Sequence, residues 1–258
     1  YLENIKFYCI IMSEEYIIGR NPVLEALKSD RDINKIMIAE GSQKGSMGQI
    51  IELAKEKKVL TQIVPKKKID AMGVGVHQGV IAAVAAYQYA ELDDLFELAE
   101  KRNEAPFFLI LDEIEDPHNL GSIMRTADAT GAHGIIIPKR RAVGLTATVA
   151  KASTGAIEYI PVARVTNLAR TIEELKDRGL WIAGTDAKGS DDYRQLDGGM
   201  SIGIIIGSEG KGMSRILKEK CDFLVHMPMV GKVTSLNASV AAGLLMYEVY
   251  RKRNPLGQ

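Results

Sequence analysis

Residues 202–212 read IGIIIGSEGKG, an unbroken apolar run that ends in a glycine-rich loop. A second run of this kind, FFLIL at residues 107–111, is followed by the polar stretch from Asp112 to Asn119. Such runs are typical of strands that are buried on both faces of a parallel sheet. Segments with helical spacing lie between and after these runs, at residues 120–130, 171–178 and 237–250. The pattern predicts an α/β domain with a parallel sheet over residues 106–258.

A second, smaller α/β pattern occupies residues 13–86. Short apolar runs alternate there with helical spacing, the runs at residues 33–39, 59–64 and 80–86 and the helices at 23–28 and 49–58. Asn21 is suited to cap the first of these helices, and Pro22 is suited to its first turn. We therefore expect a small N-terminal α/β domain.

The segments outside these two patterns have a different character. Residues 87–105 contain six acidic and two basic side chains, which indicates an acidic linker or a solvated connecting helix between the domains. Residues 1–12, YLENIKFYCIIM, lack the features of a signal peptide and end at Met12. We interpret them as a non-native or disordered leader.

The overall composition is that of an ordinary globular protein. Hydrophobic residues make up 46% of the 258 positions and charged residues 26%, which excludes disordered and collagen-like chains. No apolar run reaches the roughly 18 residues of a membrane-spanning helix. Two cysteines fit a reducing cytoplasm, and Lys plus Arg balance Asp plus Glu at 33 each. The net charge of zero therefore gives no support to a nucleic-acid partner.

Three loops follow or precede the apolar runs and carry the polar residues of interest. The first contains N-L-G-S-I-M-R-T-A from Asn119, with Arg125. The second is G-S-E-G-K-G from Gly207, with Glu209. The third contains M-P-M from Met227 and then S-L-N-A-S from residue 235. Each loop taken alone fits a structural interpretation, since Asn and Ser are favoured helix caps. In an open parallel sheet, however, ligands bind at the carboxyl ends of strands.

Taken together, the three loops resemble the three motifs of the SPOUT superfamily of RNA methyltransferases, in its 2′-O-ribose methyltransferase branch. The resemblance covers residues 106–258, and the chain departs from it at Met227, where Ile is common. Residues 13–86 are similar to the N-terminal RNA-binding domain of bacterial 23S ribosomal RNA guanosine 2′-O-methyltransferases. The tRNA-specific relatives generally lack that domain. The resemblance therefore implies methylation of a guanosine ribose in 23S ribosomal RNA.

The resemblance also implies a deep trefoil knot in the C-terminal domain, a homodimer formed through that domain, and S-adenosylmethionine as the cofactor. By the same resemblance, the cofactor is held by Gly207, Met227 and Leu236, with Thr185 as a plausible addition. No metal is needed, and the four histidines show no zinc-ligand spacing.

The resemblance assigns catalytic roles to five residues: Asn119, Arg125, Glu209, Ser235 and Asn237. Methyl transfer to a ribose hydroxyl builds negative charge on the 2′-oxygen, and a guanidinium aimed at that oxygen stabilises the charge. Arginine side chains keep their proton in proteins, so we expect Arg125 to stabilise this charge rather than to act as the base. Asn119 and Glu209 would orient Arg125 and substrate groups. Ser235 and Asn237 would form the pocket wall.

Other functions stay open. The target could be a tRNA ribose, or an adenosine whose methylation gives antibiotic resistance, because base selection by RNA enzymes leaves no readable motif. A non-catalytic RNA-binding protein is disfavoured by the intact motif residues. A nucleotide-binding oxidoreductase is disfavoured because no G-x-G-x-x-G follows the run at residues 107–111.

Overall fold

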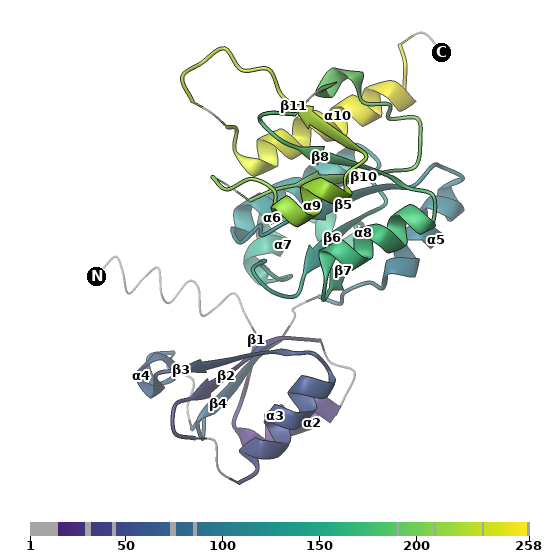
Figure 1. The fold of residues 1–258 in the computed structure, drawn as a ribbon. Coiled ribbons are helices and arrows are strands. Elements are labelled where there is room, and N and C mark those ends of the chain that lie inside the picture. The colour runs from purple at the N-terminus through teal and green to yellow at the C-terminus, as the bar shows by residue number, and fades with distance from the viewer. Residues whose placement is uncertain are drawn as a thin grey trace. The chain divides into compact units, whose positions relative to one another are not determined.

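The structure is a computed structural model that describes residues 15–28, 32–42, 45–72, 76–84, 87–189, 191–208, 210–233 and 235–256. The predicted leader, residues 1–12, and the predicted site residue Glu209 lie outside the described residues. The chain divides into two compact units (Figure 1). The first comprises the residues up to Gln88 together with Gly144–Ala147, and the second comprises the rest.

The first unit is a mixed sheet with helices. Its elements are β1 (Glu15–Ile18), α2 (Arg20–Lys28), β2 (Ile33–Ala39), α3 (Met47–Glu56), β3 (Leu60–Val64), α4 (Lys66–Asp70) and β4 (Val80–Val84). The strand order is β1-β4-β2-β3, with β4 antiparallel to both neighbours and β2 parallel to β3. Apolar residues of α2 and α3 pack in one core, and Ile69 at α4 packs in a second one. The predicted small α/β domain is confirmed.

The start of the first helix differs from the prediction. Helix α2 begins at Arg20, so Asn21 lies inside the first turn and does not cap it. Gly19 takes the place of the cap: its φ is +92°, and its carbonyl accepts a hydrogen bond from the backbone N–H of Val23 at 3.1 Å. Glycine adopts this left-handed conformation at little cost. Pro22 lies in the first turn, as predicted.

The second unit is built around a larger sheet. Its elements are α5 (Leu92–Arg102), β5 (Phe107–Leu111), α6 (Pro117–Ala129), β6 (Gly134–Pro138), α7 (Ala147–Ser153), η1 (Ala156–Glu158), β7 (Val162–Val165), α8 (Leu168–Asp177), β8 (Trp181–Thr185), β9 (Asp191–Asp192), η2 (Tyr193–Gln195), β10 (Ile202–Ile206), α9 (Arg215–Lys220), β11 (Phe223–His226) and α10 (Ala238–Arg253). Within the described residues the strand order is β7-β6-β5-β10-β8-β11-β9, and every pair is parallel. The predicted parallel α/β fold is confirmed.

The strand order explains why distant loops meet. Strands β5 and β10 are neighbours in register, with Leu111 opposite Ile206. Parallel neighbours end at the same edge of the sheet, so the loops after these two strands start side by side. Both strands are completely buried, as their unbroken apolar sequences indicate. The deep trefoil knot stays a prediction.

The acidic segment at residues 87–105 is more than a connector. It contains α5, whose Leu95 is fully buried in the core of the second unit with Phe108. A capping box between Glu91 and Asp94 starts this helix, and its acidic side chains face solvent. Apolar packing therefore makes α5 part of the second unit, although its charges suggested a linker. The domain boundaries drawn from the sequence remain a proposal.

The long C-terminal helix α10 packs against α6. Its last residue, Arg253, donates hydrogen bonds to the backbone carbonyls of Gly198 at 2.7 Å, Ala105 at 2.8 Å and Met200 at 3.1 Å. These bonds fasten the end of α10 to the segments that enter β5 and β10. The position of α10 relative to the sheet is thereby fixed from the end opposite the predicted site.

Candidate active site

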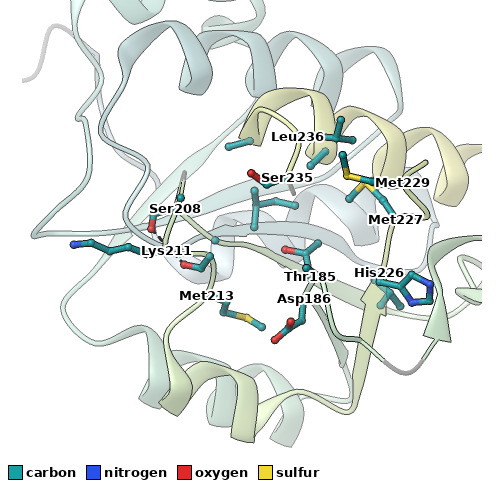
Figure 2. Close-up of a pocket in the computed structure, with 18 of the residues that line it drawn as sticks. Thr185, Asp186, Ser208, Lys211, Met213, His226, Met227, Met229, Ser235 and Leu236 are labelled. Atoms are coloured by element: carbon teal, nitrogen blue, oxygen red, sulfur yellow. Dashed lines mark hydrogen bonds between the residues drawn. The ribbon is translucent and has the colours of Figure 1, made fainter. Parts of the chain in front are cut away.

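A cavity of about 690 Å³ opens at the carboxyl ends of β8, β10 and β11, beside the start of α10 (Figure 2). Its lining includes all four residues predicted to hold a cofactor and one predicted catalytic residue: Thr185, Gly207, Met227, Leu236 and Ser235. The loops after β8, β10 and β11, which are far apart in the sequence, thus line one cavity. The individual roles of these residues stay predictions.

The glycine-rich loop after β10 is closed on itself by backbone hydrogen bonds. Ser208 and Gly212 pair through two of them, at 2.9 and 3.2 Å. A Cβ placed on Gly207 would lie 2.3 Å from the backbone nitrogen of Met213, which is closer than van der Waals contact allows. Only glycine therefore fits at this position, and the backbone of the loop itself forms the cavity wall.

Asp112 holds the same loop from the neighbouring strand. It directly follows β5, and its carboxylate accepts a hydrogen bond from the backbone N–H of Ser214 at 3.0 Å. Burial raises the pKa of Asp112 above its ordinary value, partly offset by this hydrogen bond. Asp112 was not among the predicted site residues, although its place directly after a buried apolar run is a signal that the sequence contains.

A second cavity of about 310 Å³ adjoins the first. Its lining is mostly from the loop after β5 and comprises Glu113, Ile114, Glu115, Asp116, Asn119, Ser208 and Lys211. Ser208 and Lys211 line both cavities. The two hollows therefore share one wall, which is the glycine-rich loop.

Asn119 is not the cap of its helix. The carboxylate of Asp116 caps α6 by accepting from the backbone N–H of His118 at 2.9 Å, and Pro117 begins the helix. Asn119 is only 6% exposed. Its side-chain oxygen accepts a hydrogen bond from Nδ2 of Asn237 at 3.0 Å. The first and third motifs are thus joined directly.

Asn237 has a structural role as well. Its Oδ1 accepts from the backbone N–H groups of Ser239 at 2.9 Å and Val240 at 3.3 Å, so Asn237 is the N-cap of α10. Ser235 lies before this cap and lines the first cavity instead. One amide side chain therefore starts α10 and also binds the residue of the first motif.

Three predicted catalytic residues are not among the lining of either cavity in the described structure, and one of them is Asn237, which caps α10. Arg125 is exposed on α6 and lines neither cavity. Glu209 lies outside the described residues. Their roles stay predictions.

Further groups at the first cavity were not anticipated from the sequence. Asp186 and Lys218 both line it and form an ion pair at 2.6 Å. The hydrogen bond from Lys218 holds the pKa of Asp186 below its usual value. His226 also lines the cavity, and its buried Nδ1 has no hydrogen-bond partner in the described part of the chain.

The described residues contain no group of three or more His, Cys, Asp or Glu that could hold a metal ion.

Residues 106–247 match the SpoU rRNA Methylase family. The chain belongs to this family. Residues 16–90 match the domain described as RNA 2′-O ribose methyltransferase substrate binding. The resemblance of the three loops to RNA 2′-O-ribose methyltransferases is thus confirmed, and the chain is a SpoU-family RNA methyltransferase that uses S-adenosylmethionine.

Similar proteins support the same assignment. The chain is 70% identical over 244 residues to YacO of Bacillus subtilis (strain 168), which is assigned by name to the TrmH family of tRNA/rRNA methyltransferases; the match covers 95% of this chain and 98% of that protein. The solved AdoMet-bound rRNA methyltransferase of Sinorhizobium meliloti is 26% identical, with a TM-score of 0.58, and the match covers 92% of this chain and 87% of that one. The TrmH/SpoU tRNA modifying enzyme of A. aeolicus is 28% identical, with a TM-score of 0.53, over 62% of this chain and 83% of that one.

The residues of the first cavity fit S-adenosylmethionine. The cavity volume of about 690 Å³ lies within the range of roughly 300 to 1,000 Å³ for small-molecule sites. Its wall combines apolar side chains, such as Leu236 and Met213, with the hydroxyls of Thr185 and Ser235. The buried Nδ1 of His226 has no hydrogen-bond partner in the described residues, and a bound ligand could provide one.

In the described residues, no helix has the length and apolar character needed to span a membrane.

Proposed function

We propose that this SpoU-family enzyme methylates the ribose 2′-hydroxyl of a guanosine in 23S ribosomal RNA, in the cytoplasm. The choice of ribosomal RNA rests on the share of this chain that each solved structure matches. The rRNA methyltransferase of Sinorhizobium meliloti matches 92% of this chain, whereas the tRNA modifying enzyme of A. aeolicus matches 62%. The substrate-binding domain matched at residues 16–90 is of a length that would account for this difference.

The second cavity supports guanosine as the target. Its lining includes Glu113, Glu115 and Asp116, and carboxylates accept hydrogen bonds. Asp116 uses one oxygen to cap α6, and Glu113 pairs with Arg141, so Glu115 and the second oxygen of Asp116 are the acceptors for a base. Guanine presents an amino group and a ring N–H side by side on its Watson–Crick edge, whereas adenine presents an amino group alone. A nucleobase that enters this cavity is therefore favoured when it is guanine.

We assign the chemistry to the residues that surround the two cavities. When bound, S-adenosylmethionine supplies an electrophilic methyl group. Thr185, Gly207, Met227 and Leu236 hold it, and the hydrogen bond between Asn119 and Asn237 keeps the wall of the second cavity fixed. Arg125 and Glu209 complete the site as proposed catalytic residues, together with Ser235. A guanidinium at the 2′-oxygen stabilises the charge that grows there.

We further propose a homodimer formed through the second unit. Helix α10 leaves a row of large apolar side chains exposed at helical spacing, Val240, Leu244 and Tyr247. Such a row is typical of a helix that packs against a partner. A second copy of this chain is the occupant that the SPOUT resemblance implies. Light scattering of the wild type and of Tyr247→Lys tests this, with a dimer expected only for the wild type.

The substrate is tested by mapping ribose methylation in cells with and without the gene. We expect one guanosine of 23S ribosomal RNA to lose its 2′-O-methyl group in the deletion strain and to regain it on complementation. Unchanged ribosomal RNA together with a methylation lost from tRNA would overturn the proposed substrate. Complementation of the deletion strain with the Arg125→Ala variant shows whether the methylation depends on the proposed catalytic residue.

A further inference from the structure

The wall between the two cavities contains Lys211, a residue of the second motif that has no role in the proposed function above. Lys211 lines both the cavity that fits S-adenosylmethionine and the smaller cavity beside it. A methyl group moving from a cofactor in one cavity to an acceptor in the other crosses the boundary between them. A residue that lines both cavities therefore borders the path of transfer.

The backbone of the loop presents this lysine outward. Lys211 lies between Gly210 and Gly212, whose φ angles are +80° and +68°. Glycine is the residue that adopts these left-handed angles without strain. Lys211 extends from the loop away from Met227 and Met229, which lie on the opposite side of the first cavity (Figure 2). Its ammonium is thus directed away from the far wall of the cofactor cavity.

The charge of Lys211 is available to a ligand. Two lysines line the cavities among the described residues, and the other one, Lys218, is paired with Asp186 at 2.6 Å. Lys211 is exposed and forms no ion pair or hydrogen bond within the part of the chain that the structure describes. The catalytic candidate Arg125 lines neither cavity in this structure. Among the described residues, Lys211 is therefore the cation at the shared wall that forms no ion pair.

The surroundings of Lys211 otherwise disfavour an anionic substrate. Glu113, Glu115 and Asp116 place carboxylates around the second cavity, and Arg141 pairs with only one of them, Glu113, at 2.7 Å. An RNA segment that enters beside them carries one negative charge per phosphate. A cation at the shared wall offsets this repulsion at the point where the acceptor ribose must lie.

We propose that the ammonium of Lys211 contacts an anionic oxygen of the acceptor nucleotide, which is either the reacting 2′-oxygen or the adjacent phosphate. This proposal rests on the proposed function. In the transfer, the 2′-oxygen forms a bond to the methyl carbon and its proton passes to water. The carbon–sulfur bond breaks, and its electron pair stays on sulfur. Negative charge grows on the 2′-oxygen as the proton leaves, and an adjacent ammonium stabilises it.

The test compares Lys211→Met and Lys211→Arg with a matched control, Lys101→Met, which removes one charge from the exposed surface of α5. Three quantities are measured on each variant: the affinity for S-adenosylhomocysteine by calorimetry, the affinity for RNA without cofactor, and the single-turnover methylation rate at saturating RNA. We expect Lys211→Met to keep the S-adenosylhomocysteine affinity within about twofold. Lys101→Met should match the wild type in all three, and Lys211→Arg should keep most of the function because it keeps the charge.

The two sources of the anionic oxygen give different results for Lys211→Met. A rate about 100-fold lower, with RNA affinity unchanged, identifies the 2′-oxygen. An RNA affinity about tenfold or more lower, with the rate at saturation unchanged, identifies the phosphate. Wild-type values of both, or a loss confined to S-adenosylhomocysteine affinity, would overturn the proposal. If the wild type methylates tRNA instead of 23S ribosomal RNA, the proposed substrate fails, and the same comparison on tRNA still tests Lys211.

Discussion

Replacing Asn237 by alanine removes two separate contributions to stability. The first is the cap of α10, which Oδ1 makes with two backbone N–H groups, and losing such a cap costs about 1 kcal/mol. The second is the hydrogen bond from Nδ2 to the buried oxygen of Asn119, and losing the partner of a buried polar group costs about 1–3 kcal/mol. We therefore expect Asn237→Ala to lower the free energy of unfolding of the second unit by about 2–4 kcal/mol.

Asn237→Ser separates the two contributions. Serine caps helices about as well as asparagine but is too short to reach Asn119. We expect it to lower the free energy of unfolding by about 1–3 kcal/mol, which leaves it about 1 kcal/mol more stable than the alanine variant.

Urea denaturation followed by tryptophan fluorescence measures these differences, because the chain has one tryptophan, Trp181, and it lies in the second unit. Calorimetry with S-adenosylhomocysteine should show weaker binding by Asn237→Ala, since Ala238 and Ala241 at the start of α10 line the first cavity. A stability of Asn237→Ala within about 0.5 kcal/mol of the wild type would refute this reasoning, because each contribution alone exceeds that value.

Three more changes have defined outcomes. Gly207→Ala should abolish detectable S-adenosylhomocysteine binding in calorimetry, because its Cβ would lie 2.3 Å from the backbone nitrogen of Met213; near-normal affinity would contradict the close approach. Arg125→Ala should lower the single-turnover rate by roughly 100-fold, with little change in thermal midpoint or cofactor affinity, and Arg125→Lys should restore little of it. Normal turnover in Arg125→Ala would show that this arginine is a surface residue. The pKa of His133 is lowered by burial from 6.5, and its Nδ1 accepts from the backbone N–H of Phe107 at 3.0 Å, so the folded protein resists protonation of this ring. Stability should therefore fall as the pH drops below about 6.5, where the unfolded chain takes up the proton, and urea midpoints of His133→Gln between pH 7 and 5 should show a smaller slope.

The central strands could be predicted because burial on both faces leaves a direct mark in the sequence. Strands β5 and β10 coincide with the apolar runs at residues 107–111 and 202–206. Helix α5 was obscured for the opposite reason. Its acidic residues outnumber its basic ones, yet Leu95 and Ala99, four residues apart, form a buried stripe on one face. A count of charges does not detect a stripe of that kind.

The site was only partly predictable. The resemblance to a known family identified the loops that line the first cavity. A family motif specifies site positions that physical reasoning from a single sequence does not. The ion pair between Asp186 and Lys218 joins the ends of different elements, and the bond between Asn119 and Asn237 spans 118 positions. Such pairs depend on the order of strands in the sheet, in which β10 lies between β5 and β8. Short-range sequence patterns do not specify the order of strands in a sheet.

The place of α10, after the other elements of the second unit in chain order, has a consequence for synthesis. The cofactor cavity takes part of its wall from residues 235–241, and Arg253 fastens the helix to segments made much earlier. A ribosome adds about 5–20 residues per second, so the 16 residues of α10 require roughly 1–3 s. Until they emerge, the glycine-rich loop has no complete cavity to close. The enzyme therefore becomes competent to bind its cofactor only after α10 has been made, and a nascent chain that lacks this helix is not yet able to bind S-adenosylmethionine.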